Sequence, residues 1–454
     1  MKALRLLPFL AGLMLASSFA KAPKEKTANE EPQTINLATA LRLAGAQNVE
    51  IKLVAEKVVL ARAEHHAVQQ QYFPWLAVGA GYHGHQENIQ AVDGQILDVE
   101  KSSLDLGVAV KAQLEIGETY YRSLAARQLV KASEHALESQ RQTSLHAAAR
   151  AYFDLVRAQS EVKVAGEALH IASDYETQVK RAVDAGIAFA GDAYRIQTQV
   201  AADELSQRQA QEIRRIAAAR LAEILHLDST VNLVAADEAV GPLKLSPAAG
   251  ALPGLVQRAL RDRPEMHMTA AQREAARTSR DGAKYAPLFP AISAQYSYGG
   301  LAGGRGTEIA NYHESSDYGI GIYWRIGPGG LFDRARQESA ESRLRSTELD
   351  ADKLRDEIAR EVVESKTRVA SLAEQLTISE RILASAQKTL ELSRDRKEFG
   401  VGIVAETIQS EQDLTRARRE YLGILASYNQ ACFTLRWALG ALLDPGSEKG
   451  RDAK

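Results

Sequence analysis

A long stretch with a seven-residue apolar repeat most constrains what this chain can fold into. Residues 331–397 contain no proline, so nothing in them stops a helix. A seven-residue spacing of apolar side chains is typical of a helix that packs along a coiled-coil seam. At ~1.5 Å per residue this helix would be about 100 Å long, so it needs a partner of similar length. The repeating residues are Val362, Val369, Leu376, Leu383 and Leu390.

An internal duplication supplies such a partner. An earlier proline-free stretch, residues 118–184, carries apolar residues that a constant offset of 214 positions superimposes on the later ones. The same offset superimposes the breaks that follow the two stretches. A match of spacing, break and trailing residues in one register indicates a duplicated chain. The matched pairs are Leu155 and Val369, Val162 and Leu376, Leu169 and Leu383, Gly186 and Gly400, Asp192 and Glu406, and Leu221 and Leu435.

Each repeat is predicted to run helix, β-hairpin, long helix, tip and second helix. Pro74 and Pro290 end the helices that precede the hairpins, and Pro242 and Pro247 interrupt the segment between the repeats. The predicted ranges are 37–227 for the first repeat (hairpin 75–114, tip 185–191), 228–250 for the linker, 251–442 for the second repeat (hairpin 291–326, tip 399–405) and 443–454 for a disordered tail.

The two hairpins alternate apolar and polar residues, as strands with one apolar face do. Each predicted strand spans roughly 9 to 11 residues, about the length that a tilted strand needs to cross a bilayer. An apolar face opposite a polar one is the pattern of an outer-membrane barrel, and a half-buried sheet of a soluble protein is the alternative. The polar face carries Asp105, Lys111, Gln113, Ser293, Gln295 and Arg325.

Four strands are too few to close such a barrel, since known ones begin at about eight. An open edge in lipid would leave backbone groups unpaired, at several kcal/mol each. The barrel must therefore be shared between chains. Two copies would contribute eight strands and three would contribute twelve, and the alternation alone does not choose between them.

The beginning of the chain and its composition suggest an exported protein. Residues 1–22 are predicted to be a signal peptide, since Lys2 and Arg5 precede a short apolar run and a small-residue cleavage site. Residues 23–36 are predicted to be a flexible linker. The formal net charge of −2 gives no reason to expect a nucleic-acid partner. The single cysteine, Cys432, rules out an intrachain disulfide.

The remaining reactive residues favour no catalytic or cofactor site. His83 and His85 begin the polar segment 83–103, and His313 falls in the glycine-rich segment 299–316; both segments are predicted to be loops. Loop histidines are more often solvated than bound to metal, so a metal site is possible here but is not predicted. We therefore expect no enzymatic activity, no metal and no cofactor.

Short motifs at the ends of the predicted elements carry a family resemblance. Phe-Pro pairs precede both hairpins, a Gly-Pro-Gly-Gly turn follows the second, and a glycine break ends each long helix. In their order and twofold recurrence over residues 37–442, these motifs resemble the TolC-like outer-membrane efflux proteins. The motif residues are Phe73, Pro74, Phe289, Pro290, the turn 327–330, the breaks 185–187 and 399–401, and Ala438, Leu439 and Gly440.

The resemblance implies an α+β membrane protein in the outer membrane of a Gram-negative cell envelope. Three chains would form a homotrimer with a twelve-stranded β-barrel in the lipid and a long α-helical coiled-coil tunnel in the periplasm. The implied partners are a periplasmic adaptor (membrane fusion) protein and an inner-membrane pump. The protein itself would be a passive exit duct.

The resemblance also assigns roles to the two tips. They would contact the adaptor, and carboxylates just beyond the second tip would narrow the tunnel mouth. Glu406 lies at such a position, Gln409 stands at the next one, where a carboxylate is usual, and Asp192 occupies the place of Glu406 in the first repeat. The carboxylates of three chains would form a gate that favours cations. The alternative for the carboxylates is that they only offset the dipole of their own helix, by ~0.3–1 kcal/mol. The expected contact residues are Ala185, Gly186, Ile187, Phe399, Gly400 and Val401, and the expected gate residues are Asp192, Glu406 and Gln409.

Three functions compete at this point. The first is an exit duct for small molecules, and the second is an exit channel for type I secretion of polypeptides, which the same architecture would serve. The third is a structural coiled coil of the envelope that conducts nothing. The polar face of the predicted strands argues against the third, because a rod without a lumen has no use for it.

Overall fold

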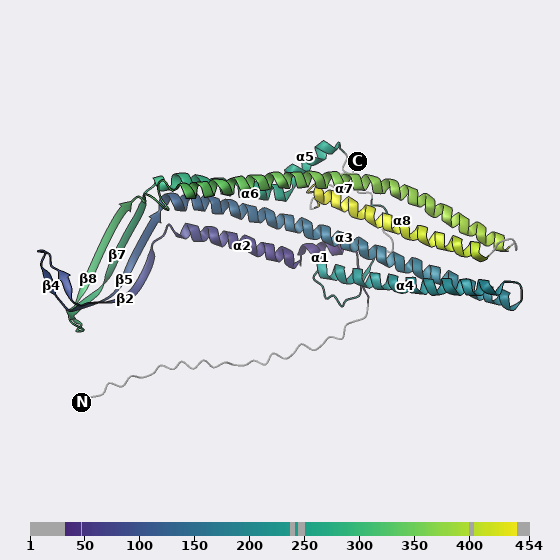
Figure 1. The fold of residues 1–454 in the computed structure, drawn as a ribbon, viewed down its shortest axis with the longest axis horizontal. Coiled ribbons are helices and arrows are strands. Elements are labelled where there is room, and N and C mark those ends of the chain that lie inside the picture. The colour runs from purple at the N-terminus through teal and green to yellow at the C-terminus, as the bar shows by residue number, and fades with distance from the viewer. Residues whose placement is uncertain (1–31, 47, 237–240, 244–249, 399–403, 443–454) are drawn as a thin grey trace, which may run out of the picture.

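The computed structural model describes residues 32–46, 48–236, 241–243, 250–398 and 404–442. The predicted signal peptide, most of the predicted linker 23–36 and the predicted tail lie outside these residues. The described chain is a long rod of helices with a β-sheet at one end (Figure 1). Among the described residues, no helix combines the length and the hydropathy needed to cross a membrane.

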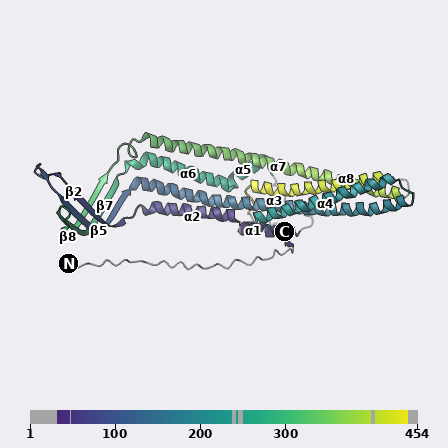
Figure 2. The same ribbon diagram turned by 60° about the horizontal axis from the view of Figure 1, so that its bottom comes forward.

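Two long helices, one from each repeat, run the length of the rod (Figure 2). Shorter helices lie beside them, so that α2 and α4 pack along α3, and α6 and α8 along α7. Each long helix thus gains a partner of similar length from two shorter helices. The bounds are α1 Leu37–Ala46, α2 Val49–Gln70, α3 Ile116–Asp184, α4 Ala190–Ile224, α5 Leu252–Asp262, α6 Pro264–Tyr285, α7 Arg334–Glu398 and α8 Val404–Ala438, with a 3₁₀ turn, η1, at Ala286–Leu288.

The seven-residue repeat of α7 faces its partner helices. Four of its five positions are buried, and Leu383 is half-buried.

Two helix boundaries, between α1 and α2 and between α5 and α6, were not predicted from the apolar periodicity. Asn48 separates α1 from α2 by accepting a hydrogen bond from the Ile51 N–H at 3.2 Å, as an N-cap does. Pro264 starts α6 at the first helical position, where its missing N–H costs nothing.

The four main strands form one antiparallel sheet in the order β2-β5-β7-β8. The polar segments 83–103 and 299–316, predicted to be loops, hold the ends of these strands and a small β3–β4 ladder. They form strands because the hydrogen bonds between paired strands use backbone groups only, so polar side chains do not prevent them. The bounds are β2 Trp75–His85, β3 Asn88–Gln90, β4 Ile96–Asp98, β5 Lys101–Glu115, β7 Ala291–Arg305 and β8 Ala310–Tyr323.

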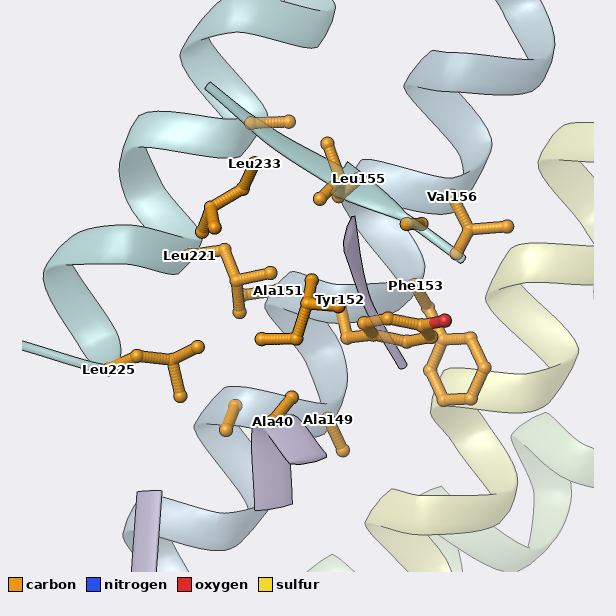
Figure 3. Close-up of a cluster of buried hydrophobic side chains, with 14 of the residues drawn as sticks. Ala40, Ala149, Ala151, Tyr152, Phe153, Leu155, Val156, Leu221, Leu225 and Leu233 are labelled. Atoms are coloured by element: carbon orange, nitrogen blue, oxygen red, sulfur yellow. The ribbon is translucent and has the colours of Figure 1, made fainter. Parts of the chain in front are cut away.

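The largest core lies in the middle of the rod. It joins residues of α3, among them Tyr152 and Leu155, to Leu221 of α4 and to Leu225 just beyond the end of α4. The Phe153 ring points toward α8 (Figure 3), and its centroid lies 5.6 Å from that of the Phe433 ring. A short parallel ladder covers this core, since β1 (Gln33–Ile35) pairs with β6 (Leu233–Ala235). Three residues of the predicted flexible linker 23–36 are therefore a strand, held by backbone bonds to the segment between the repeats.

Candidate functional site

The first tip, between α3 and α4, is a tight turn that exposes apolar side chains. Gly186 takes a left-handed conformation (φ 72°), which glycine adopts without strain. The N–H groups of Ala185, Gly186 and Ile187 donate to carbonyls of the last turn of α3. The side chains of Ile187 and, two residues further on, Phe189 are exposed. The three residues expected to contact an adaptor thus lie on the outer surface of this turn.

The second tip is only partly described. Phe399, Gly400 and Val401 lie outside the described residues, and the chain resumes at Val404, the first residue of α8. Glu406 lies in the first turn of α8, and its Oε1 is 2.9 Å from Nη1 of Arg396 on α7. This ion pair ties the start of α8 to the end of α7.

The other two residues expected at the gate are also bonded within their own hairpins. The carboxylate of Asp192, in the first turn of α4, lies 3.3 Å from the guanidinium of Arg195. The Gln409 amide donates to Asp413 at 3.1 Å, one turn further along α8. Asp192 and Glu406 thus sit at helix N-termini, where a carboxylate offsets the dipole, whichever role they have.

An apolar cluster joins the two hairpins just behind the tips. Tyr175 and Val179 of α3 and Ile196 of α4 are buried against Val404 and Ile408 of α8. Burial raises the pKa of the Tyr175 hydroxyl, the neighbouring Thr407 lowers it, and the carboxylates of Glu411 and Asp192 raise it. The charge of Asp192 acts on the Tyr175 hydroxyl, and Thr407, the residue next to Glu406, contacts the same hydroxyl. The cluster therefore brings the two halves of the predicted gate into one region.

Between this cluster and the core in the middle of the rod, polar contacts also join the two hairpins. The Gln412 amide donates to Gln199, and the Arg419 guanidinium donates to the Ser206 hydroxyl, both from α8 to α4. Arg418 pairs with Glu167 of α3 at 3.0 Å. Polar contacts exchange with water at a small net cost, of order 0.5–1.5 kcal/mol each, so this seam can separate more easily than an apolar one.

Nothing in the sequence pointed to these contacts. They join residues that are more than 200 positions apart in the chain, and glutamine, serine and arginine on a helix face are ordinary surface residues. Asp203 lies in the same seam, where burial raises the pKa of its carboxyl although bonds to Gln199 and the charge of Arg419 oppose the shift.

The sheet brings the predicted polar face together. Lys111 lies opposite Gln295 in the ladder, and Gln113 lies opposite Ser293, so their side chains share one face with Asp105. The Lys111 ammonium is 5.5 Å from the ring centroid of Trp75, on the same face. Arg325 lies just past the end of β8, 3.7 Å from Glu115.

The opposite face of the sheet is apolar and exposed. The most exposed of its large apolar side chains are Tyr318 at 86% and Ile320 at 81%. A contiguous exposed apolar surface of this kind marks contact with a membrane or another protein. Its members include Leu76, Val78, Tyr82, Leu106, Val108, Val110, Tyr296, Tyr298, Tyr318, Ile320 and Ile322.

A protein-family comparison matches part of the chain. Residues 255–441 match the family described as outer membrane efflux protein. None of the curated proteins compared with the sequence matches it. The resemblance seen in the duplicated motifs is thus confirmed. The family is one of passive channels, not of enzymes, in agreement with the absence of a predicted catalytic site.

Solved structures with the same fold match nearly the whole chain. A membrane protein from Pseudomonas aeruginosa has a TM-score of 0.77 and 20% identity, over 89% of this chain and 92% of its own. The Campylobacter jejuni CmeC outer membrane channel has a TM-score of 0.77 and 15% identity, over 89% and 86%. The open Neisseria gonorrhoeae MtrE outer membrane channel has a TM-score of 0.71 and 17% identity, over 89% of each chain.

Proposed function

We propose that this chain, whose residues 255–441 match the outer membrane efflux protein family, is the outer-membrane exit duct of a tripartite efflux system. As a homotrimer it would conduct substrates passively from a periplasmic adaptor and an inner-membrane pump to the exterior. The observation that carries the proposal is the four-stranded sheet, which has one polar face, one exposed apolar face and two edges that no other described strand pairs with.

The sheet supports a shared barrel. Among the described residues its outer strands, β2 and β8, each pair on one side only, and such edges are stable in lipid only when another strand covers them. Three copies would contribute twelve strands, an even number in the range of outer-membrane barrels. The exposed apolar face would contact lipid, and the face with Asp105, Lys111 and Gln295 would line the lumen.

The helices support a tunnel that continues the barrel. The α3 helix has 69 residues and α7 has 65, so each is about 100 Å long, far beyond the ~30 Å hydrocarbon core of a bilayer. They would extend into the periplasm and carry the tips toward the adaptor. Ala185, Gly186 and Ile187 at the first tip, with Phe399, Gly400 and Val401 at the second, would form the contact surface.

The gate belongs to the same proposal. Asp192 and Glu406 of three chains would place six carboxylates near the tunnel mouth, with Gln409 one turn further in. The ion pairs with Arg195 and Arg396 hold these carboxylates close to the helix starts. A narrow ring of such groups favours the passage of cations over anions.

Conductance and assembly test the proposed function. Purified protein added to a planar lipid bilayer should produce discrete single-channel current steps, and cross-linking of outer membranes should yield a species of three chains. A structural coiled coil would give no current at any protein concentration. Cross-linking that stops at one chain would contradict the shared barrel.

A further inference from the structure

Three histidines lie near the end of the sheet that is remote from the helices. His83 and His85 are the last alternate residues of β2, and His313 lies in the first part of β8. Residues two apart in a strand point to the same face, with Cα atoms roughly 6.7 Å apart. The two β2 histidines therefore present their imidazoles side by side, at a spacing that allows both to bind one metal ion. The loop predicted for this segment would not have fixed that spacing.

The surroundings of these histidines are also those of a metal site. Nδ1 of His83 lies 3.5 Å from Oδ1 of Asp105, a carboxylate that would orient the ring and leave Nε2 outward. Nε2 of His85 is buried and has no hydrogen-bond partner among the described residues. His313 shares their face, because Leu301 pairs with both Asp105 and His313 across the sheet. Within one described chain, however, no three metal-ligating residues come together.

A second copy brings the third histidine into place. In the proposed barrel, β8 of one chain pairs with β2 of the next, antiparallel. Within the chain, Trp75, Lys111, Gln295 and Gly319 pair in turn and form one row across the sheet, from β2 to β8. If the helix-proximal ends of the strands align where two chains meet, Trp75 lies opposite the partner subunit's Tyr323. Tyr323 is four residues beyond Gly319, so the row shifts by four residues from one chain to the next. His85 then lies directly opposite the partner subunit's His313.

The tilt of the strands tests this register. A pairing row that shifts by about four residues per chain shifts by twelve around a barrel of three chains. At spacings of ~3.3 Å along and ~4.8 Å between strands, this shift tilts the strands by about 35° from the barrel axis. An odd shift would turn the polar face outward. The next even shift, about six, gives a tilt of about 46° and moves His85 one diagonal step from the partner subunit's His313. Both values lie at the limits of the 35–45° range of known barrels.

We propose that His83 and His85, together with the partner subunit's His313, form a binding site for a divalent transition-metal cation such as Zn²⁺ at each seam of the trimer. This inference rests on the proposed trimeric barrel. Three neutral imidazoles leave one position of a tetrahedral cation for water. Lys101 lies opposite His85 and Arg305 lies opposite Lys101, so two positive charges share this face with the histidines, and Asp105 is the carboxylate that contacts His83. A bound cation would join neighbouring chains at the outer end of the duct.

The seam register is tested by cross-linking. The double variant His85→Cys with His313→Cys, in a Cys432→Ala background that removes the only native thiol, should form disulfides between chains on oxidation. The matched control is Tyr82→Cys with His313→Cys, whose side chains face opposite sides of the sheet. Disulfides in the control, or none in the test pair of a protein that cross-links chemically as a trimer, would overturn the register.

Metal binding is measured on the purified wild-type trimer with Zn²⁺ as the probe. Equilibrium dialysis should give about one Zn²⁺ per chain, and Zn²⁺ should raise the temperature at which the trimer dissociates. Both effects should be lost in His85→Ala and equally in His313→Ala, and kept in His170→Ala, a control with an exposed histidine on α3. Asp105→Asn should weaken binding about 10–100-fold, as the loss of an orienting carboxylate does.

The outcomes separate this proposal from the proposed function. A protein that is monomeric and conducts no current would remove the barrel, and the seam with it. A conducting trimer that binds no Zn²⁺, or whose binding survives His313→Ala, would overturn the metal site and leave the duct intact.

Discussion

The imidazole of His146 lies flat against the indole of Trp437, with 5.0 Å between the ring centroids and 10° between the ring planes. A side-chain hydrogen bond of 2.9 Å joins the same imidazole to the Thr434 hydroxyl. The guanidinium of Arg263 is 4.5 Å from the centroid of the same indole. Trp437 therefore connects α3, α8 and the start of α6 near the middle of the rod.

This contact makes stability depend on pH. Burial, with the charge of Arg150, lowers the pKa of His146 from 6.5 to about 4. Above pH 6.5 the ring is neutral in both the folded and the unfolded chain, and it contributes no pH dependence. As the pH falls below 6.5, His146 binds a proton in the unfolded chain, but in the folded chain it stays neutral until about pH 4. The free energy of unfolding therefore decreases between pH 6.5 and about pH 4.

We expect the loss at pH 5 to be between about 1 and 2 kcal/mol, after allowance for solvent screening of a half-buried ring. Thermal unfolding of wild type and of His146→Gln at pH 7 and pH 5 measures it. Glutamine can still bond to Thr434 but does not titrate, so its stability should fall less on acidification. Equal losses in the two proteins would show that His146 is not the group responsible.

Arg263 should be among the most sensitive charged residues of the chain. Its side chain is 4% exposed and pairs with Glu265, at 3.2 Å, and with Glu361. Replacing it by methionine leaves two carboxylates without their cation in a partly buried site, which we expect to cost about 3–5 kcal/mol in the free energy of unfolding. Urea denaturation measures the loss.

The matched control is Arg345→Met. Arg345 pairs with Glu341 one turn away at 3.7 Å, and both side chains are more than half exposed. Exposed pairs of this kind contribute less than about 1 kcal/mol. Similar losses in the two variants would mean that the buried ion pairs of Arg263 are not what stabilises this junction.

Local patterns predicted the regular parts of this fold. A seven-residue repeat depends only on one helix face, so the buried positions of α7, Val362 and Val369 among them, could be read directly. The two-residue alternation similarly predicted which residues share the polar face of the sheet, because side-chain direction in a strand follows from position alone. The coarse architecture, long duplicated helices with two strands per repeat, follows from these two periods.

Contacts between distant segments could not be read in that way. The β1–β6 ladder, the stacking of His146 on Trp437 and the bond between Gln199 and Gln412 each join residues whose identities are ordinary at the surface. The strand ends at His85 and His313 were missed because polar strands lack the apolar alternation that lipid imposes. The gate and adaptor roles of the tips stay predictions.

Two glycines should respond in opposite directions to the same substitution. A Cβ on Gly117, in the first turn of α3, would lie 2.4 Å from the carbonyl oxygen of Ala286, which is backbone and cannot swing away. Gly117→Ala should therefore cost about 1–3 kcal/mol by overpacking. A Cβ on Gly423, within α8, meets nothing within 4 Å. Gly423→Ala should stabilise the helix by up to about 1 kcal/mol.

Thermal unfolding of the two alanine variants measures both effects. The shifts in unfolding temperature should have opposite signs relative to wild type, since the same methyl group meets backbone at one site and open space at the other. A stabilising Gly117→Ala would mean that the junction between α3 and η1 yields to the added carbon.

The double variant Asp192→Asn with Glu406→Gln tests whether the tip carboxylates select ions. If three chains bring six of these groups to a narrow mouth, their removal should lower the preference for cations over anions, because the fixed negative charge at the mouth disappears. In a planar bilayer with a salt gradient, the zero-current potential should move toward zero. The conductance should persist.

The alternative role of these carboxylates makes a different prediction. If they only offset helix dipoles, the double variant should lose about 0.3–1 kcal/mol of stability per helix and keep the wild-type selectivity. The control is Glu341→Gln with Glu348→Gln, which removes the same charge from α7 near its sheet-proximal end. A zero-current potential that shifts as much in this control as in the tip variant would attribute selectivity to the overall charge of the tunnel rather than to a gate at Asp192 and Glu406.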